Sequence, residues 1–282
     1  MTVRLGDNQY GKAETHVVRV TKGPADDIRD LTVSIALAGD FASTHLTGDN
    51  SNVVPTDTQK NVVFAFAKDP IGEVEEFALR LAGHFVHSHA AVERARVSIA
   101  EQPWTRIHPH AFELAGSEKR LTAVTSTRDA HWVVSGLTGL TLLKTAGSEF
   151  WGYPKDRYTT LPETHDRVLA TAVDARWRYS GAGANWAEAR AEARQLIVET
   201  FATTHSLSLQ QTLYAIGEAV LEARHEIAEI RFSMPNKHHF AVDLKPFGLE
   251  NDNEVFYASD RPFGLIEATV TRDDAVPADQ AW

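Results

Sequence analysis

LTVSIAL, residues 31–37, alternates large apolar side chains with small or polar ones. Successive side chains of a strand point to opposite faces, so one face would collect Leu31, Val33, Ile35 and Leu37. This alternation is typical of an antiparallel sheet with one buried face and one solvated face. The sequence therefore predicts a fold that is built on antiparallel strands.

The sequence on both sides of this stretch alternates strand patterns with helical ones. Strands are expected at residues 11–20, 92–99 and 121–125, and residues 131–144 hold enough apolar sequence for a strand pair. A polar loop is expected over residues 104–119. The letters TDTQ at 56–59 fit a capping box; the following VVFAFA could form a strand, but we favour a short helix. A second helix is expected after Asp69 and Pro70, with an apolar stripe of Val74, Phe77, Ala78, Leu81 and Phe85.

The order of elements restarts near Leu140. A strand pattern at 139–145 is followed by a loop, a capping box over 160–163 and another strand at 168–179. Long helices are expected from Asn185 and from the capping box at 208–211. Short strands then follow at 230–232, 240–244, 255–257 and 265–271. Strands and paired helices that occur twice predict an α+β protein with tandem repeats at residues 1–137 and 138–282.

The composition is that of an ordinary globular protein, and it excludes several classes of function. The net charge of −10 and the absence of a Lys/Arg run disfavour a nucleic-acid surface. No apolar run approaches the ~20 residues that span a bilayer, and the start lacks the apolar core of a secretory signal. Because the chain has no cysteine, disulfides, thiolate chemistry and Cys-ligated zinc are excluded. We expect a cytoplasmic protein with no nucleic-acid and no membrane partner.

A histidine cluster at His84, His87 and His89 suggests a metal site. Residues at i, i+3 and i+5 do not share a helix face, however. No HExxH motif or carboxylate pair accompanies them. We therefore expect no metal at this cluster.

The stretch SMPNKHHF, residues 233–240, is the first candidate for chemistry. We expect Asn236 and His238 where a loop enters the strand at 240–244, with Pro235 restricting the backbone. An amide and a group that titrates near neutral pH are useful at the edge of a pocket. Asn-Lys-His-His is also ordinary turn composition, so a merely solvated turn remains the alternative.

Other polar groups also stand at the ends of expected elements. Arg167 can grip a planar oxo-anion with two parallel N–H bonds. Gln210 lies in the first turn of a helix, where an anion is favoured, although Gln210 and Gln211 could simply cap that helix. Phe150 offers a stacking face or a core side chain. Lys12, at the mouth of the first strand, is by default a solvated lysine.

The sequence resembles the urate oxidase (uricase) family over nearly the whole chain. The resemblance is carried by long motifs that occur in order along the chain. They are YGK at 10–12, TDTQKN at 56–61, GLTLLKTAGSEFWGYPKD at 139–156, YTTLPETHDR at 158–167, LQQTLY at 209–214, MPNKHHF at 234–240 and NEVFYASDRPFGLIEATV at 253–270.

This resemblance implies a tunnelling fold (T-fold) of the α+β class. Each chain would carry two tandem repeats of antiparallel sheet and paired helices. Dimers would close an antiparallel barrel, and two such rings would stack into a homotetramer with sites at the subunit interfaces. The implied activity, part of purine catabolism, is oxidation of urate by O2 to 5-hydroxyisourate and H2O2, without a metal or an organic cofactor.

The resemblance also implies a role for each matching site residue. Arg167 and Gln210 resemble pincers on one edge of urate, and the backbone N–H of Leu209 meets the purine. The remaining binding positions are a stacking ring at Phe150, an apolar wall at Ile266, an amide for dioxygen at Asn236, and Thr56 and Asp57 from the neighbouring chain. The implied proton relay consists of Lys12, Thr56 and His238, in which Lys12 acts as base through the Thr56 hydroxyl.

Two other functions remain open at this point. One is another tunnelling-fold enzyme that acts on a purine or pterin, such as a zinc cyclohydrolase, which the absence of cysteine disfavours. The other is a non-catalytic purine-binding protein. Because the sequence retains Lys12, Thr56 and His238 together, we favour the oxidase.

Overall fold

The computed structural model describes residues 2–282, and the chain divides into two compact units. The first unit contains residues up to 136 together with 178–187 and 276–282. The second contains residues 137–177 and 188–275. The chain passes between them within strand β7 (His131–Lys144), which is one long strand and not the expected pair. The division of the chain into two tandem repeats, at residues 1–137 and 138–282, stays a prediction.

The sheet of the first unit contains the alternating stretch from which the fold was predicted. Its strands are hydrogen-bonded in the order β1 (Tyr10–Thr21), β2 (Asp27–Gly39), β3 (Val92–Glu101) and β6 (Lys119–Ser126), followed by the start of β7. The first three pairings are antiparallel. All four predicted inward residues of β2 are buried, so the one-faced burial predicted for this strand is confirmed.

Three helices belong to the first unit: α1 (Ala42–Thr47), α2 (Thr56–Phe66) and α3 (Val74–Ser88). The VVFAFA stretch is helical, as predicted, but Pro55 takes the N-cap position and no side chain caps α2. The expected start of α3 near Asp69 is wrong. The Arg80 side chain donates to the carbonyls of Pro70 and Ile71, at 3.1 and 3.4 Å, which holds that segment as a loop. The predicted apolar stripe of α3 is buried.

A small two-stranded sheet replaces most of the expected polar loop at residues 104–119. It consists of β4 (Trp104–His108) and β5 (Ala111–Leu114), which pair antiparallel. A short 3-10 helix, η2 (Asp279–Ala281), lies at the C-terminal end of this unit, and Arg96 of β3 donates to the carbonyl of Ala281 at 2.8 Å. The C-terminal segment therefore belongs to the fold of the first unit.

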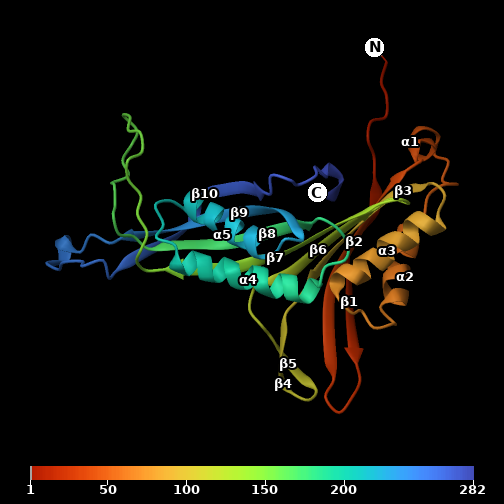
Figure 1. Ribbon diagram of the computed structural model, residues 1–282, viewed down its shortest axis with the longest axis horizontal. Helices are drawn as coiled ribbons and strands as arrows, with labels where there is room; N and C mark the ends of the chain where they lie inside the picture. Colours follow the sequence, from red (N-terminus) through yellow and green to blue (C-terminus); the bar gives the residue numbers. More distant parts are fainter. Residues whose placement is uncertain (1) are drawn as a thin grey trace. The chain divides into compact units, whose positions relative to one another are not determined.

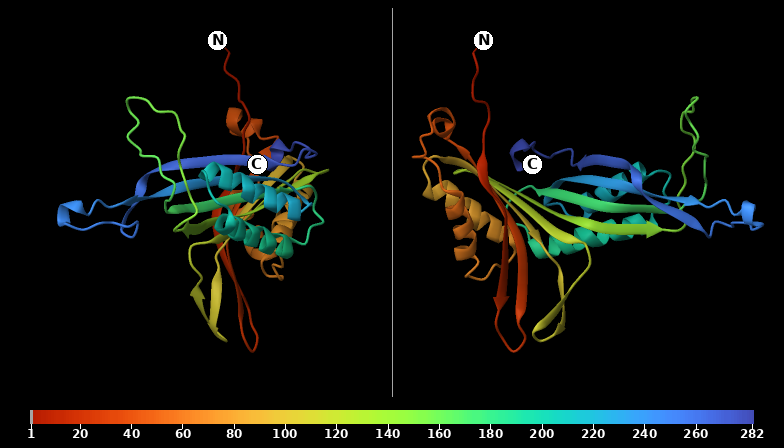
Figure 2. Two further views of the ribbon diagram at one scale, coloured as in Figure 1. Left: turned by 60° about the vertical axis from the view of Figure 1, so that its left-hand side comes forward. Right: turned by 180° about the vertical axis from the view of Figure 1, so that it is seen from behind.

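The second unit contains the remaining strands of the same strand order and a helix pair. The end of β7 is followed by β8 (Leu169–Tyr179), β9 (Ile227–Ala241) and β10 (Phe256–Thr271), and β9 and β10 pair antiparallel. Helices α4 (Trp186–Thr203) and α5 (Leu209–Ala223) lie side by side on one face of this sheet (Figure 1 and Figure 2). Gly217 permits the close contact of α5 with β10, because a Cβ there would lie 2.5 Å from Val270 Cγ2.

The stretch SMPNKHHF does not form a loop at the entrance to a strand, and that expectation is wrong. It lies inside β9, where Asn236 pairs with Gly264 and His238 with Ser259 of β10. The pairing register shifts between Ser259 and Gly264, directly opposite this stretch. Pro235 itself pairs with Leu265, just beyond this irregularity, and its carbonyl accepts from the Thr171 hydroxyl at 2.9 Å.

Residues 145–168 form a long excursion from the second sheet, and the expected capping box at 160–163 does not start a helix (Figure 1). The Glu163 carboxylate accepts from the Gly152 N–H at 2.9 Å, so it is not available for a cap. Pro162 also disfavours helical geometry at Leu161. A further 3-10 helix, η1 (Lys245–Phe247), interrupts the segment between β9 and β10.

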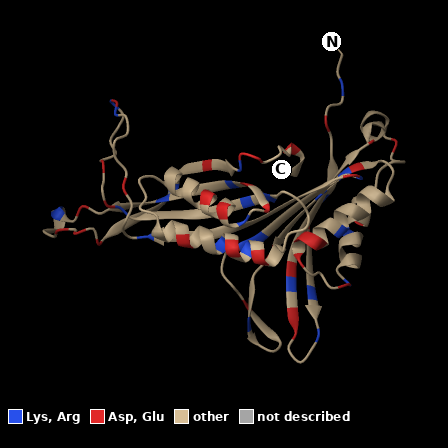
Figure 3. Cartoon of the chain, viewed as in Figure 1, with Lys and Arg blue, Asp and Glu red and all other residues tan. Residues whose placement is uncertain are grey.

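The fold is thus α+β, with antiparallel sheets and helices, as predicted. Within residues 2–282, every helix is too short or too polar to cross a lipid bilayer. Acidic and basic side chains are interspersed along α4, and no basic stripe follows this helix (Figure 3).

Candidate active site

A cavity of about 290 Å³ opens in the second unit between the 150–168 excursion and the end of β9. Its volume is at the lower end of the range for small-molecule pockets, ~300–1,000 Å³. Four residues predicted as site residues line it: Phe150, Arg167, Asn236 and His238. The other lining residues are Leu161, Pro162, Thr164, Asp166, Val168, His239, Phe240, Ala241, Asn253 and Phe256.

Arg167 is fixed at the wall of this cavity by Ser148. The Arg167 backbone N–H donates to the Ser148 carbonyl at 3.0 Å, and Nε donates to Ser148 Oγ at 3.1 Å. Burial lowers the pKa of the Arg167 guanidinium, which still carries its charge at neutral pH. Among the side chains that the structure describes, no carboxylate lies within ion-pair distance of it. Its terminal N–H groups are therefore available for an anionic ligand.

Phe150 supplies an aromatic face next to this cation. The Arg167 guanidinium carbon lies 5.2 Å from the Phe150 ring centroid, and Tyr153 stacks on the same ring at 4.9 Å. Antiparallel backbone hydrogen bonds between Phe150 and Thr164, of 2.8 and 3.0 Å, fix the position of the ring. The half-buried ring is part of the cavity wall, so the stacking alternative fits better than a side chain of the closed core.

Asn236 and His238 reach the cavity from β9. Residues two apart on a strand point to the same face, which brings the amide and the imidazole together. Burial, and after it the positive charge of Arg167, lowers the pKa of His238. The imidazole is therefore neutral at neutral pH and able to accept a proton.

Leu209, Gln210 and Ile266 are not among the residues that line this cavity. Leu209 is the buried first residue of α5, and Ile266 is a half-buried residue of β10. The helix is capped without Gln210. Ser208 Oγ accepts from the Gln211 N–H at 3.1 Å, and Gln211 Oε1 accepts from the Leu207 N–H at 2.9 Å. Gln210 is exposed, which leaves its amide available for another role.

Lys12, Thr56 and Asp57 belong to the first unit. Tyr10 connects their segments, because its hydroxyl accepts from the Val54 N–H at 2.7 Å and donates to the Val54 carbonyl at 3.2 Å. Neighbouring Lys60, then Asn61 and Lys12, lower the pKa of Asp57. The strand start that carries Lys12 and the helix start that carries Thr56 are therefore held together.

Gly11 sets the position of Lys12 on β1. A Cβ at residue 11 would lie 1.8 Å from the Ile35 carbonyl oxygen of β2, so only glycine permits this approach. Lys12 itself pairs with Ile35 and is half-buried.

One polar group next to Phe150 was not predicted from the sequence. Glu149 contacts Trp151, His165 and His205, none of which was singled out. His205 is 56 positions away in the chain, and no local pattern relates two residues at that spacing. Within the described residues, no cluster of His, Asp and Glu is arranged to hold a metal ion.

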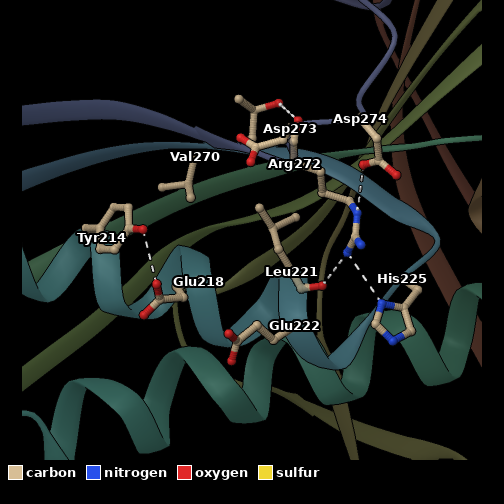
Figure 4. A pocket seen from close by; sticks show the side chains of 10 residues that line it. Tyr214, Glu218, Leu221, Glu222, His225, Val270, Arg272, Asp273 and Asp274 are labelled. Carbon is tan, nitrogen blue, oxygen red and sulfur yellow. Dashed lines mark hydrogen bonds and ion pairs between the residues drawn. The ribbon is translucent and has the colours of Figure 1, made fainter.

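A second concavity in the same unit, of about 520 Å³, is lined by carboxylates (Figure 4). Arg272 is the cation there, but it is occupied by the Leu221 carbonyl at 2.9 Å and by Asp274 at 3.3 Å. Tyr214 donates to Glu218 at 3.1 Å. No predicted site residue lines this pocket. Its acidic lining would repel an anion, so the cavity beside Arg167 is the better anion site. The acidic residues are Glu218, Glu222, Asp273 and Asp274.

Comparison with known proteins gives a consistent result. The family model described as Uricase matches residues 8–125 and 133–267. The chain is 50% identical to the uricase of Arthrobacter globiformis over 99% of its own length and 94% of that protein, and 35% identical to the uricase of Aspergillus flavus over 94% and 95%. The crystal structure of the Arthrobacter globiformis uricase superposes with a TM-score of 0.96, covering 99% of this chain and 98% of that one.

Proposed function

Because the chain belongs to the uricase family, a family of tunnelling-fold oxidoreductases, we propose that it oxidises urate with O2. The products are 5-hydroxyisourate and H2O2. The observation that carries the proposal is the cavity in which an unpaired guanidinium, an aromatic face and a neutral imidazole meet. These groups suit a flat anion that must give up protons.

In the proposed complex, urate lies against Phe150 and is gripped at one edge by Arg167 and Gln210. Arginine offers two parallel N–H donors, and an amide complements an edge with one donor and one acceptor. The backbone N–H of Leu209 meets the purine, and Ile266 closes the apolar wall. The start of α5 is tied toward Phe150, because the Glu149 N–H donates to the Ser206 carbonyl at 2.7 Å.

A neighbouring chain completes the site in this proposal. Thr56 and Asp57 approach the opposite edge of urate, and Lys12 comes with them. Support comes from the edge strands: β1 and β10 each end their sheet, and both expose large apolar side chains. Unpaired strand edges invite a partner chain. We propose a homotetramer with sites at the subunit interfaces. The expected cytoplasmic location stays a prediction.

The proposed reaction requires no metal and no organic cofactor, because the electron-rich urate anion itself reduces dioxygen. The protein holds the two reactants together and moves protons. Lys12 accepts a proton from the substrate through the Thr56 hydroxyl. Asn236 holds O2 and later water over the ring, and neutral His238 passes a proton to or from that water.

The test is a paired measurement of urate absorbance and dissolved oxygen with the purified protein. The proposal predicts loss of urate with equal consumption of O2 and formation of H2O2. A purine-binding protein would bind urate without consuming O2, and a zinc cyclohydrolase would leave urate unchanged and contain zinc on metal analysis. Either result would refute the oxidase.

A further inference from the structure

The Glu149 carboxylate is surrounded by donors from several parts of the second unit. It accepts from His205 Nε2 at 2.5 Å, from Trp151 Nε1 at 2.7 Å and from His165 at 3.1 Å. A carboxylate only accepts, so both imidazoles present an N–H to it. These hydrogen bonds lower the pKa of Glu149 to about 2, with His205 as the largest cause, and the group is ionised at any working pH.

The partners of Glu149 sit next to the residues that bind substrate in the proposed site. Glu149 itself precedes Phe150, and His165 lies two positions before Arg167. His205 lies in the short segment between α4 and α5, just before Leu209 and Gln210. One side chain thus joins the three segments that carry the aromatic face, the cation and the amide.

Backbone hydrogen bonds join the same segments from the inside. The Glu149 N–H donates to the Ser206 carbonyl at 2.7 Å, and the Ser206 N–H donates to the Gly147 carbonyl at 2.9 Å. Ser148 accepts from the Arg167 backbone N–H at 3.0 Å. Ser148 and Ser206 are both fully buried. The carboxylate and the buried backbone hydrogen bonds therefore join the same segments.

Glu149 lies outside the cavity in which the reaction is proposed to take place. It does not line the cavity. The side chains of His165 and His205 are 73% and 60% exposed, while that of Glu149 is 18% exposed. Pairs with such exposed partners contribute little to global stability. We therefore assign to these hydrogen bonds a local effect on the relative positions of the segments that they join.

We infer that Glu149 is a positioning residue for urate binding: by holding His165 and His205 it fixes Phe150, Arg167 and the start of α5 relative to one another. The inference rests on the proposed function. It assigns to Glu149 an effect on affinity and none on the chemical step, because the relay of Lys12, Thr56 and His238 does not pass through it.

The test compares Glu149→Ala and Glu149→Gln with Glu199→Ala, which removes an exposed carboxylate of α4 that accepts a hydrogen bond from Gln195 of the same helix at 2.7 Å. Urate binding is measured by calorimetry without oxygen, so that no turnover occurs. Steady-state kinetics and thermal unfolding are measured on the same samples. Glu149→Gln keeps the size of the side chain and serves if Glu149→Ala folds poorly.

We expect Glu149→Ala to raise both the anaerobic Kd and KM for urate about tenfold, because small losses of alignment at a binding site are costly. Its kcat should change by less than about threefold, Glu149→Gln should be intermediate, and Glu199→Ala should match the wild type. His205→Ala should reproduce most of the effect, and adding it to Glu149→Ala should add little, since both remove one contact.

Two results would overturn the inference while the proposed function stands. One is wild-type binding of urate with an unchanged Kd and KM in both Glu149 variants. The other is a parallel loss of kcat and thermal stability in both, which is the signature of a merely structural role. If the wild-type protein itself binds no urate without oxygen, the proposed function fails, and the inference fails with it.

Discussion

Replacing Arg167 with alanine tests the proposed role of this residue in binding urate. Nε of Arg167 is used by Ser148, so the terminal N–H groups remain for the substrate. A hydrogen bond to a charged group contributes about 1.5–3 kcal/mol, and the fork makes two of them. The lower figure gives about 3 kcal/mol, or a rise of about 150-fold in KM for urate. Arg167→Lys keeps the positive charge but loses the two parallel N–H donors, so its KM should lie between those of the wild type and Arg167→Ala.

Steady-state oxygen uptake over a wide range of urate concentrations measures this effect. The matched control is Arg157→Ala, an exposed residue of the same excursion whose guanidinium lies 4.5 Å from the Tyr158 ring centroid and outside the cavity. Its KM should equal that of the wild type. If KM of Arg167→Ala stays within about threefold of the wild type while the protein remains folded, Arg167 does not bind urate.

Three further predictions concern the relay and the fold. Lys12→Met should lower kcat by about 10²–10⁴ with an unchanged anaerobic Kd for urate, and an unchanged kcat would remove Lys12 from the relay. Because burial and Arg167 lower the pKa of His238, its NMR titration should lie below the ordinary ~6.5 and move upward in Arg167→Ala; no movement would show that the two groups are not coupled. Glu75→Ala should lower the free energy of unfolding in urea by about 3–5 kcal/mol, because the buried carboxylate binds Arg120 at 2.6 Å. The neighbouring variant Glu76→Ala should change it little, because Glu76 is exposed. Equal losses in the two variants would contradict this.

Local patterns predicted the elements whose burial is regular along the chain. The alternation of residues 31–37 and the apolar stripe of α3 both identify a buried face, and both are found. The helix at 56–66 was harder, because VVFAFA fits either structure. Its burial of Gln59 and Val63, four residues apart, shows the helical period that the letters alone left open.

Long-range pairing explains the main errors. Pro235 and Asn236 favour a turn by local preference, yet β10 pairs with this stretch on both sides of its irregularity and keeps it extended. Glu163 fits the sequence pattern of a capping box, but its carboxylate accepts a hydrogen bond from the Gly152 N–H instead. In each case a contact distant in sequence outweighs a local preference of a few tenths of a kcal/mol to about 1 kcal/mol.

The candidate site was predicted mainly through family resemblance and only partly through chemistry. Residue types at element ends indicated Arg167, Asn236 and His238, and the structure places these with Phe150 around one cavity. The roles of Lys12, Thr56 and Asp57 come from the matching motifs. Glu149 and its partners could not be found from the sequence, because their contacts are defined only by the folded excursion.

In the proposed assembly, Arg167 of one chain and Lys12 of another chain act on the same bound urate. Co-expression of Arg167→Ala with Lys12→Met, under two different affinity tags, tests this arrangement directly. At urate concentrations near the wild-type KM, both separate variants are nearly inactive. In isolated mixed assemblies, random pairing would then restore about one quarter of the wild-type activity, because one in four interface sites receives both intact residues. Recovery to that level is the predicted result. Mixed assemblies no more active than the separate variants would show that each site is built from a single chain, and would contradict the proposed shared site.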